Sequence, residues 1–188
     1  MAIKAKKVSH KLVEYPSICY LMKSAFPKNE QFPLWLLRLL TIRKNINFRA
    51  FFDDDQFCGI LYTAENSKYI FVLYLAVNDK IRAKGYGRRI LQWLKQSTSK
   101  TIVLNVEAIN SNATNLEQRE KRIEFYKKNG ITDTGYFFID ANERYSVLSP
   151  DSEHFDINEY KSLLKWFSLG SFKANFSKRW FYACKPAL

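Results

Sequence analysis

Residues 77–88 read Val-Asn-Asp-Lys-Ile-Arg-Ala-Lys-Gly-Tyr-Gly-Arg and decide the fold, because an apolar strand leads into them and an amphipathic helix follows. Gly85 and Gly87 carry no side chains, so a phosphate can touch the backbone amides there. The first turn of the helix leaves its N–H groups unpaired and adds the positive end of the helix dipole. Three basic residues contribute further positive charge: Arg82, Lys84 and Arg88. The stretch predicts an anion site that suits a diphosphate.

The segments on either side of this stretch predict a sheet with helices on both faces. Residues 69–77 are apolar at every position, as in a strand that is covered on both faces. Two more β-rich runs, 48–52 and 57–63, precede it after short polar connectors, which predicts an antiparallel meander. Residues 101–106 form another strand after the helix, so the chain makes a right-handed β-α-β crossover. The predicted fold class is α/β, with a mixed, mostly antiparallel central sheet, one crossover and flanking helices.

The remaining elements are predicted from hydrophobic periodicity and turn residues. We expect a strand near residues 3–8, helices over 16–26, 32–43, 116–128 and 158–168, and strands over 135–140 and 144–148. The buried stripe expected for the second helix consists of Trp35, Leu36, Leu39 and Leu40. We interpret residues 1–150 as a single domain. Residues 151–188 are expected to form a C-terminal helix and a basic, aromatic tail that packs on this domain or extends from it.

Composition narrows the class of protein further. A chain of 188 residues that is 47% hydrophobic suits one compact domain. The three cysteines, Cys19, Cys58 and Cys184, are odd in number and far apart, which indicates neither a disulfide framework nor a zinc site and fits a cytoplasmic protein. No apolar run approaches the roughly 18 residues of a membrane-spanning helix. The net charge of +12 indicates an anionic partner.

Several standard motifs are excluded. A Walker loop would end in Gly-Lys-Ser or Gly-Lys-Thr, and a dinucleotide fingerprint would need a small residue where Ile90 stands. The run Asp53-Asp54-Asp55 is interpreted as a hairpin turn, because consecutive carboxylates point in different directions and fit no calcium loop. No metal site is therefore predicted.

Residues 82–87, Arg-Ala-Lys-Gly-Tyr-Gly, match the signature of the GNAT acetyltransferase superfamily, which is Arg or Gln, two residues, Gly, one residue, then Gly or Ala. Residues 75–77 resemble the bulged strand end of that family, residues 104–113 fit its Leu-x-Val-x-x-x-Asn-x-x-Ala pattern, and residues 125–130 resemble its Tyr-x-x-x-Gly helix end. The chain resembles the family over about residues 3–148. It departs by an insertion between Ala113 and Phe125 and by Ile131, where phenylalanine is usual.

The resemblance implies a GNAT-like acyl-CoA N-acyltransferase fold. It also implies an enzyme that transfers the acetyl group of acetyl-CoA to a primary amine, by direct attack in a ternary complex. In this family the bulged strand pairs with the pantetheine arm, and backbone N–H groups near Ala76 and Val77 would stabilise the oxyanion. The residues expected at the cofactor are Leu75, Ala76, Val77, Arg82, Ala83, Lys84, Gly85, Tyr86, Gly87, Arg88, Asn110 and Tyr126.

Two side chains are candidates for catalysis. Tyr126 matches the family's tyrosine and would donate a hydrogen bond or a proton to the leaving thiolate, although packing in the core explains it as well. Glu107 follows a strand and is the candidate base, with a solvated strand-end residue as the alternative interpretation. Tyr74 or a bound water chain could also take the proton, because the family's strand glutamate falls near Phe71 and is missing.

A second function is also consistent with the sequence. A basic, non-catalytic binding module, for nucleic acid or regulation, could use the aromatic and lysine-rich tail after Gly170 and keep a degenerate cofactor pocket. We favour the acetyltransferase, with an amine of a small molecule or a peptide as substrate. Neither a membrane nor nucleic acid is expected as its partner, and a homodimer is left open.

Overall fold

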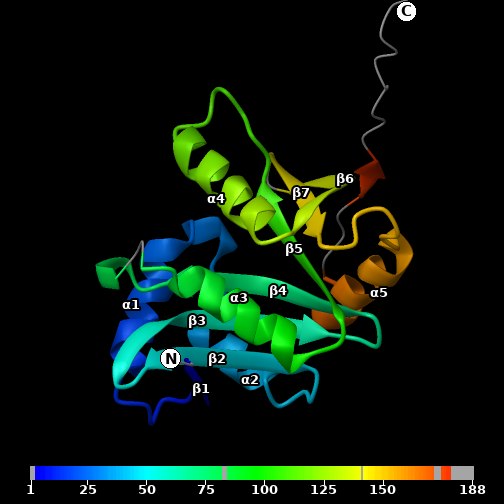
Figure 1. Ribbon diagram of the computed structural model, residues 1–188. Coiled ribbons are helices and arrows are strands. Elements are labelled where there is room, and N and C mark those ends of the chain that lie inside the picture. The colour runs from blue at the N-terminus through cyan, green and yellow to red at the C-terminus, as the bar shows by residue number, and fades with distance from the viewer. Residues whose placement is uncertain (1–2, 82–83, 141, 172–174, 179–188) are drawn as a thin grey trace, which may run out of the picture. The chain divides into compact units, whose positions relative to one another are not determined.

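The computed structural model describes residues 3–81, 84–140, 142–171 and 175–178 (Figure 1). Five α-helices and eight strands lie within these ranges. The chain divides into two compact units, Met1–Ile102 and Val103–Leu188, here called unit 1 and unit 2. The boundary falls inside β5 (Thr101–Glu107). No helix in the described ranges is long and apolar enough to cross a membrane.

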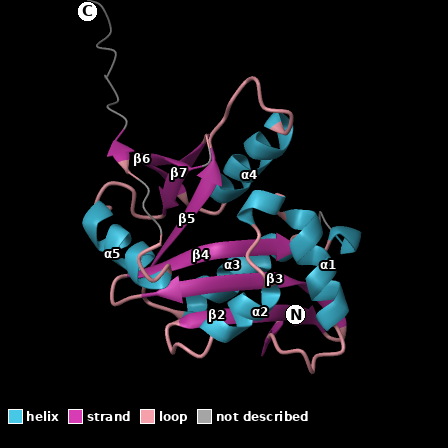
Figure 2. Ribbon diagram, turned by 180° about the vertical axis from the view of Figure 1, so that it is seen from behind, coloured by secondary structure: helices cyan, strands magenta, loops and turns pink. Residues whose placement is uncertain are grey.

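Unit 1 contains an antiparallel sheet in the order β1-β2-β3-β4. Its strands are β1 (Lys4–Lys7), β2 (Ile46–Asp53), β3 (Gln56–Glu65) and β4 (Tyr69–Val77). The side chains of β4 are all buried or half-buried, which confirms a strand covered on both faces. Helix α3 (Tyr86–Ser97) covers one face, and α1 (Tyr15–Ala25) and α2 (Leu34–Leu40) cover the other (Figures 1 and 2).

Helix α3 links β4 to β5, as the sequence predicted. Its inner side consists of Ile90, Leu91 and Leu94, which are at most 2% exposed. The backbone N–H of Thr101 donates to the carbonyl of Lys68 at 3.0 Å. The first residues of β4 and β5 therefore lie side by side, as a parallel crossover requires.

The second helix is shorter than expected and buries a different side. Pro33 precedes α2 and Thr41 follows it, so the helix spans seven residues. Leu37 is fully buried, whereas Trp35 and Leu39 are 64% and 52% exposed. The predicted stripe was wrong because apolar residues surround this helix except at Arg38, so the periodicity does not select one face.

Unit 2 is a second antiparallel arrangement, in which β7 lies between β5 and β6, and β8 adds to the far side of β6. Its elements after β5 are α4 (Leu116–Lys128), β6 (Thr132–Asp140), β7 (Glu143–Ser149), α5 (Ile157–Phe167) and β8 (Ser177–Lys178). Helix α4 has the predicted bounds and ends as predicted, with Gly130 at a φ of +69°.

The described part of the C-terminal tail packs on unit 2. The ring of Phe176 lies 5.0 Å from Phe138 and 5.9 Å from Tyr160, and Ser177 and Lys178 pair with β6. Residues 176–178 of the tail therefore pack on unit 2. Residues 179–188, including Cys184, lie outside the described ranges.

Candidate functional site

The start of α3 has the features predicted for an anion site. Gly85 precedes the helix at a φ of +79°, a left-handed conformation that side chains rarely adopt, and it is exposed. No side chain of the described residues caps this helix start. The N–H groups of Tyr86, Gly87 and Arg88 have no acceptor within the described part of the chain. Exposed side chains of Lys84 and Arg88 flank them.

Two residues of the predicted motif, Arg82 and Ala83, lie outside the described residues. The described part of the motif is Lys84 to Gly87, and Arg88 follows it.

A glycine in β3 lets α3 approach the sheet closely. A Cβ at Gly59 would collide with the carbonyl oxygen of Ala76 and would lie 3.1 Å from the Cδ1 of Ile90 and 3.2 Å from the Cα of Val77. Because a side chain at residue 59 would meet both β4 and α3, glycine at this position allows the helix to pack closely on the sheet. The sequence analysis did not single out this glycine, since the pattern of a strand does not show what packs on it.

The carboxylate of Asp53, at the β2–β3 turn, holds the first turn of α3. It accepts hydrogen bonds from the Tyr86 hydroxyl at 2.9 Å and from both terminal nitrogens of Arg89, at 2.8 and 3.1 Å. These donors, Arg89 above all, lower the pKa of Asp53 to about 2. The hairpin turn was predicted correctly, but its contact with the helix was not.

The Tyr86 side chain is therefore committed to contacts within the protein. It is 7% exposed, and its bond to Asp53 raises its pKa above the usual value. Only the main chain of Tyr86 remains available for the cofactor contact that the motif predicts.

The end of β4 is more regular than expected. Leu75, Ala76 and Val77 pair in register with Leu61, Ile60 and Gly59. The register shift between β3 and β4 falls earlier, where Tyr62 and Thr63 face Tyr74 and Val72, so Leu73 is the bulged residue. The bulge predicted at residues 75–77 thus lies two residues earlier in the pairing with β3.

Tyr74, an alternative base, is occupied by structural bonds. Its hydroxyl accepts from the backbone N–H of Phe32 and donates to the carbonyl of Glu30. Burial raises its pKa to about 12. A phenol in this state does not take a proton from an amine near neutral pH, so the structure argues against Tyr74 as the base.

The phenol of Tyr126, in α4, is largely buried and uncommitted. The residue is 7% exposed, its ring lies 5.2 Å from Phe125, and burial raises its pKa to about 12. Its hydroxyl has no hydrogen-bond partner in the described ranges. Tyr126 is therefore protonated near neutral pH and has a hydrogen bond to offer.

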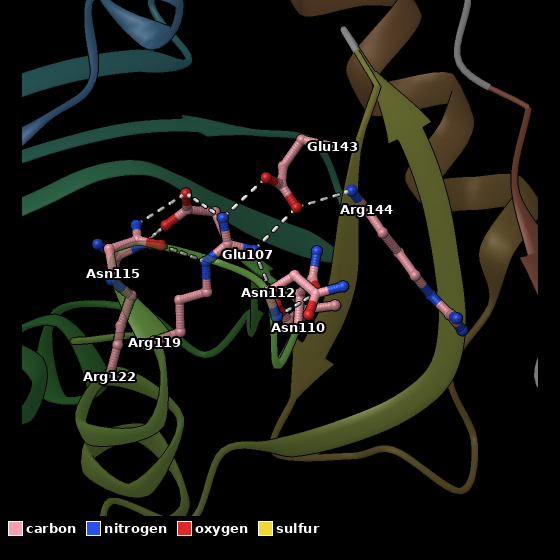
Figure 3. A network of polar contacts seen from close by, with 9 residues as sticks. Glu107, Asn110, Asn112, Asn115, Arg119, Arg122, Glu143 and Arg144 are labelled. Atoms are coloured by element: carbon pink, nitrogen blue, oxygen red, sulfur yellow. Dashed lines mark hydrogen bonds and ion pairs between the residues drawn. The ribbon is translucent and has the colours of Figure 1, made fainter. Parts of the chain in front are cut away.

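Unit 2 also contains a buried arginine that joins three segments (Figure 3). Arg119, from α4, is 5% exposed and forms a double hydrogen bond with Glu143 at 2.8 and 2.7 Å. It also donates to the carbonyl of Ala108 at 2.9 Å and to the Asn115 side chain at 2.7 Å. These bonds hold the pKa of Glu143 below its usual value. Arg119 thereby ties the end of β5 and the start of β7 to α4.

Glu107, the predicted base, belongs to this network. It is 5% exposed, and its oxygens lie 3.3 Å from Arg119 and 2.8 Å from Arg122. Asn115 donates to it at 3.4 Å. An acceptor amine could reach this carboxylate only if these ion pairs opened. The contacts explain the burial of Glu107 without catalysis and do not support its assignment as the base.

Asn110 lies at an open hollow of about 320 Å³, together with Ser111, Asn142 and Glu143. Its side-chain oxygen accepts from the backbone N–H of Asn112, and its carbonyl accepts from Ala113. The asparagine thus shapes the turn after β5, and its exposed side chain stays a candidate for the predicted cofactor contact.

Comparison with solved structures finds proteins of the family whose motif this chain resembles, whereas comparison of sequences finds none. No family model and no curated protein matches the sequence. A solved structure described as a GNAT-family acetyltransferase from Bacteroides thetaiotaomicron is 25% identical, with a TM-score of 0.72 over 90% of this chain and 99% of that one.

Two further structures are more distant in sequence. An aminoglycoside 6′-N-acetyltransferase complexed with coenzyme A is 14% identical, with a TM-score of 0.59 over 78% of this chain and 95% of that one. Naa50 from Arabidopsis thaliana, in complex with a bisubstrate analogue, is 18% identical, with a TM-score of 0.54 over 79% and 98%. The fold class and the resemblance predicted from the sequence are confirmed: this chain has the fold of the GNAT acetyltransferases.

Proposed function

We propose that the protein is an N-acetyltransferase that moves the acetyl group of acetyl-CoA to a primary amine of a small molecule or peptide. The observation that carries this proposal is the start of α3, where N–H groups without an acceptor in the described residues follow the exposed, left-handed Gly85 within the Arg-x-x-Gly-x-Gly signature. Its fold is that of acetyltransferases, one of which is complexed with coenzyme A.

The described residues fit the diphosphate of that cosubstrate. The position of a Cβ at Gly85 has no atom within 4 Å, so a phosphate can approach the backbone there. The N–H groups of Tyr86, Gly87 and Arg88 would bind its oxygens, and the Lys84 and Arg88 side chains would add charge.

Acetyl-CoA supplies an activated acyl group as a thioester. The amine nitrogen would attack the thioester carbonyl, the carbon–sulfur bond would break, and an amide and a thiol would form after the ammonium has lost its proton. Of the two main-chain N–H groups predicted to bind the oxyanion, that of Ala76 points toward β3, because Asn78, two residues later, donates to Cys58 on the same side. The N–H group of Val77 points away from β3 and remains the proposed donor to the oxyanion. No covalent acyl-enzyme is needed.

The raised pKa of Tyr126 favours one of the two roles predicted for it. A thiol has a pKa near 8.5, about 3.5 units below that of Tyr126, so complete proton transfer from this phenol to a thiolate would be unfavourable. We therefore propose that Tyr126 donates a hydrogen bond to the leaving sulfur. Three acceptors were considered for the proton of the amine: Glu107, Tyr74 and a chain of bound water. The contacts of Glu107 and Tyr74 do not support either residue as the base, so we propose the water chain.

Isothermal titration with acetyl-CoA tests the proposal. Wild-type protein should bind, and Gly85→Glu should weaken binding at least about tenfold, because the new carboxylate would repel the diphosphate. Gly170→Glu is the matched control, since Gly170 is exposed, has a φ of +81° and also has open space where a Cβ would lie. Its affinity should equal that of the wild type.

The same titration distinguishes the acetyltransferase from the second candidate function, a basic binding module without catalytic activity. If wild-type protein gave no heat with acetyl-CoA but bound oligonucleotides with an affinity that falls steeply with salt, the basic binding module would be the better interpretation. A panel of amines, aminoglycosides and peptides, screened for release of free thiol, would then identify the acceptor of an active enzyme.

A further inference from the structure

The β2–β3 hairpin reaches the start of α3 through a single carboxylate. Asp53 and Gln56 form the last pair of the hairpin, and Asp54 has a φ of +50° in the turn between them. The Asp53 side chain is 22% exposed and faces the helix instead of solvent. Unlike Asp53, Asp55 lies exposed in the same turn.

The bonds of Asp53 are concentrated on one turn of the helix. Tyr86 is the first residue of α3 and Arg89 is the fourth, so one carboxylate holds both ends of the first turn. The Arg89 guanidinium also lies 4.9 Å from the centre of the Tyr86 ring, a cation–π contact. A fork of two N–H···O bonds restricts the orientation of both partners more than a single bond does.

The remainder of α3 is anchored without Asp53. The Phe51 and Trp93 rings meet edge to face at 5.0 Å, Ile90 and Leu94 are buried, and Gly59 permits close approach. These contacts hold the helix from its second turn onward. The contacts of the first turn, which carries the uncommitted N–H groups, are with the hairpin: the bonds to Asp53 and one longer hydrogen bond, at 3.5 Å, from the Tyr86 hydroxyl to the Gln56 side chain.

The Asp53–Arg89 ion pair also affects the charge near the start of α3. An unpaired carboxylate at this place would repel an anion at the helix start, whereas the Asp53–Arg89 pair is neutral overall. Both side chains are about a quarter exposed, so water screens this pair less than it screens a fully exposed one. The two-point geometry of the pair fits a role in orienting the first turn.

We propose that Asp53 is a positioning residue that sets the first turn of α3, through Arg89 and Tyr86, in the orientation that binds the diphosphate of acetyl-CoA. This inference rests on the proposed function. Asp53 itself touches neither the cofactor nor the reacting atoms; it acts through the backbone N–H groups that follow Gly85.

Two acetyl donors distinguish this role from a general effect on the fold. Acetyl-CoA contains the diphosphate, and S-acetylpantetheine has the same thioester without it. Asp53→Asn should raise the KM for acetyl-CoA about tenfold, because preorganised donors are lost, and leave kcat nearly unchanged. The kcat/KM for S-acetylpantetheine should stay within about twofold of the wild type.

Asp55→Asn is the matched control and should behave as wild type with both donors. Arg89→Gln is a second, independent variant and covers the case in which Asp53→Asn does not fold. It should reproduce the selective loss, enlarged by repulsion from the Asp53 carboxylate that it leaves without Arg89. The double variant, which removes this carboxylate as well, should be no worse than Arg89→Gln alone.

An equal loss with both donors, or an unchanged KM for acetyl-CoA in Asp53→Asn and Arg89→Gln, would overturn the inference and leave the proposed function intact. Failure of the proposed function has a different signature. In that case wild-type protein itself would neither bind acetyl-CoA in the titration nor use either donor, and the positioning role would fall with it.

Discussion

Replacing Glu107 by glutamine separates a structural carboxylate from a catalytic one. The side chain is 6% exposed and contacts two guanidinium groups, those of Arg119 and Arg122. Glutamine has nearly the same size but carries no charge, and its amide N–H groups would face other donors. We therefore expect a loss of stability without a specific effect on proton transfer.

The size of the loss can be worked out from the network. Removing one partner of a buried ion pair typically costs about 3–5 kcal/mol. The lower value applies here, because Arg119 keeps its two hydrogen bonds to Glu143 and Arg122 is partly exposed. For a chain of 188 residues, about 3 kcal/mol corresponds to a fall in Tm of roughly 6–12 °C.

Thermal unfolding, followed by circular dichroism, measures the loss of stability. The pH profile of kcat/KM shows whether proton transfer is affected. The control is Glu124→Gln, which loses an exposed ion pair with Lys128 and should leave the Tm nearly unchanged. An unchanged Tm in Glu107→Gln, combined with loss of the acidic limb of the pH profile, would refute this reasoning and restore Glu107 as the base.

Three further predictions concern other parts of the molecule. Tyr126→Phe should lower kcat about 10²-fold and leave the Kd for acetyl-CoA unchanged, because it removes only a donor to the leaving sulfur; unaltered turnover would show that this tyrosine merely packs. Gly59→Ala should lower the free energy of unfolding in urea by about 2–3 kcal/mol, since its Cβ meets the Ala76 carbonyl; a neutral result would mean that α3 can shift. Stability should also fall between about pH 10 and 12, because Tyr74 and Tyr126 ionise near pH 10 when unfolded but at about 12 when folded, so the unfolded state releases its protons first. Urea unfolding near pH 9 and near pH 11 checks this, and equal midpoints would contradict it.

Features that depend on neighbours along the chain could be predicted from the residues alone. Hydrophobic periodicity predicted the strands 69–77 and 101–106 and the bounds of α4, because each is long and has clear turn residues at its ends. The glycines at 85 and 87, with the basic residues around them, indicated an anion site, since backbone conformation and helix dipole are local properties.

The roles of residues whose partners are distant in sequence became apparent from the folded chain. Glu107 looked like a candidate base until Arg119 and Arg122 were placed against it, 12 and 15 residues later. Asp53 looked like one of three turn carboxylates until Arg89, 36 residues away, selected it. A sequence pattern records which groups are present, but the protonation and availability of a group depend on burial and on the charges around it, and these are set by packing.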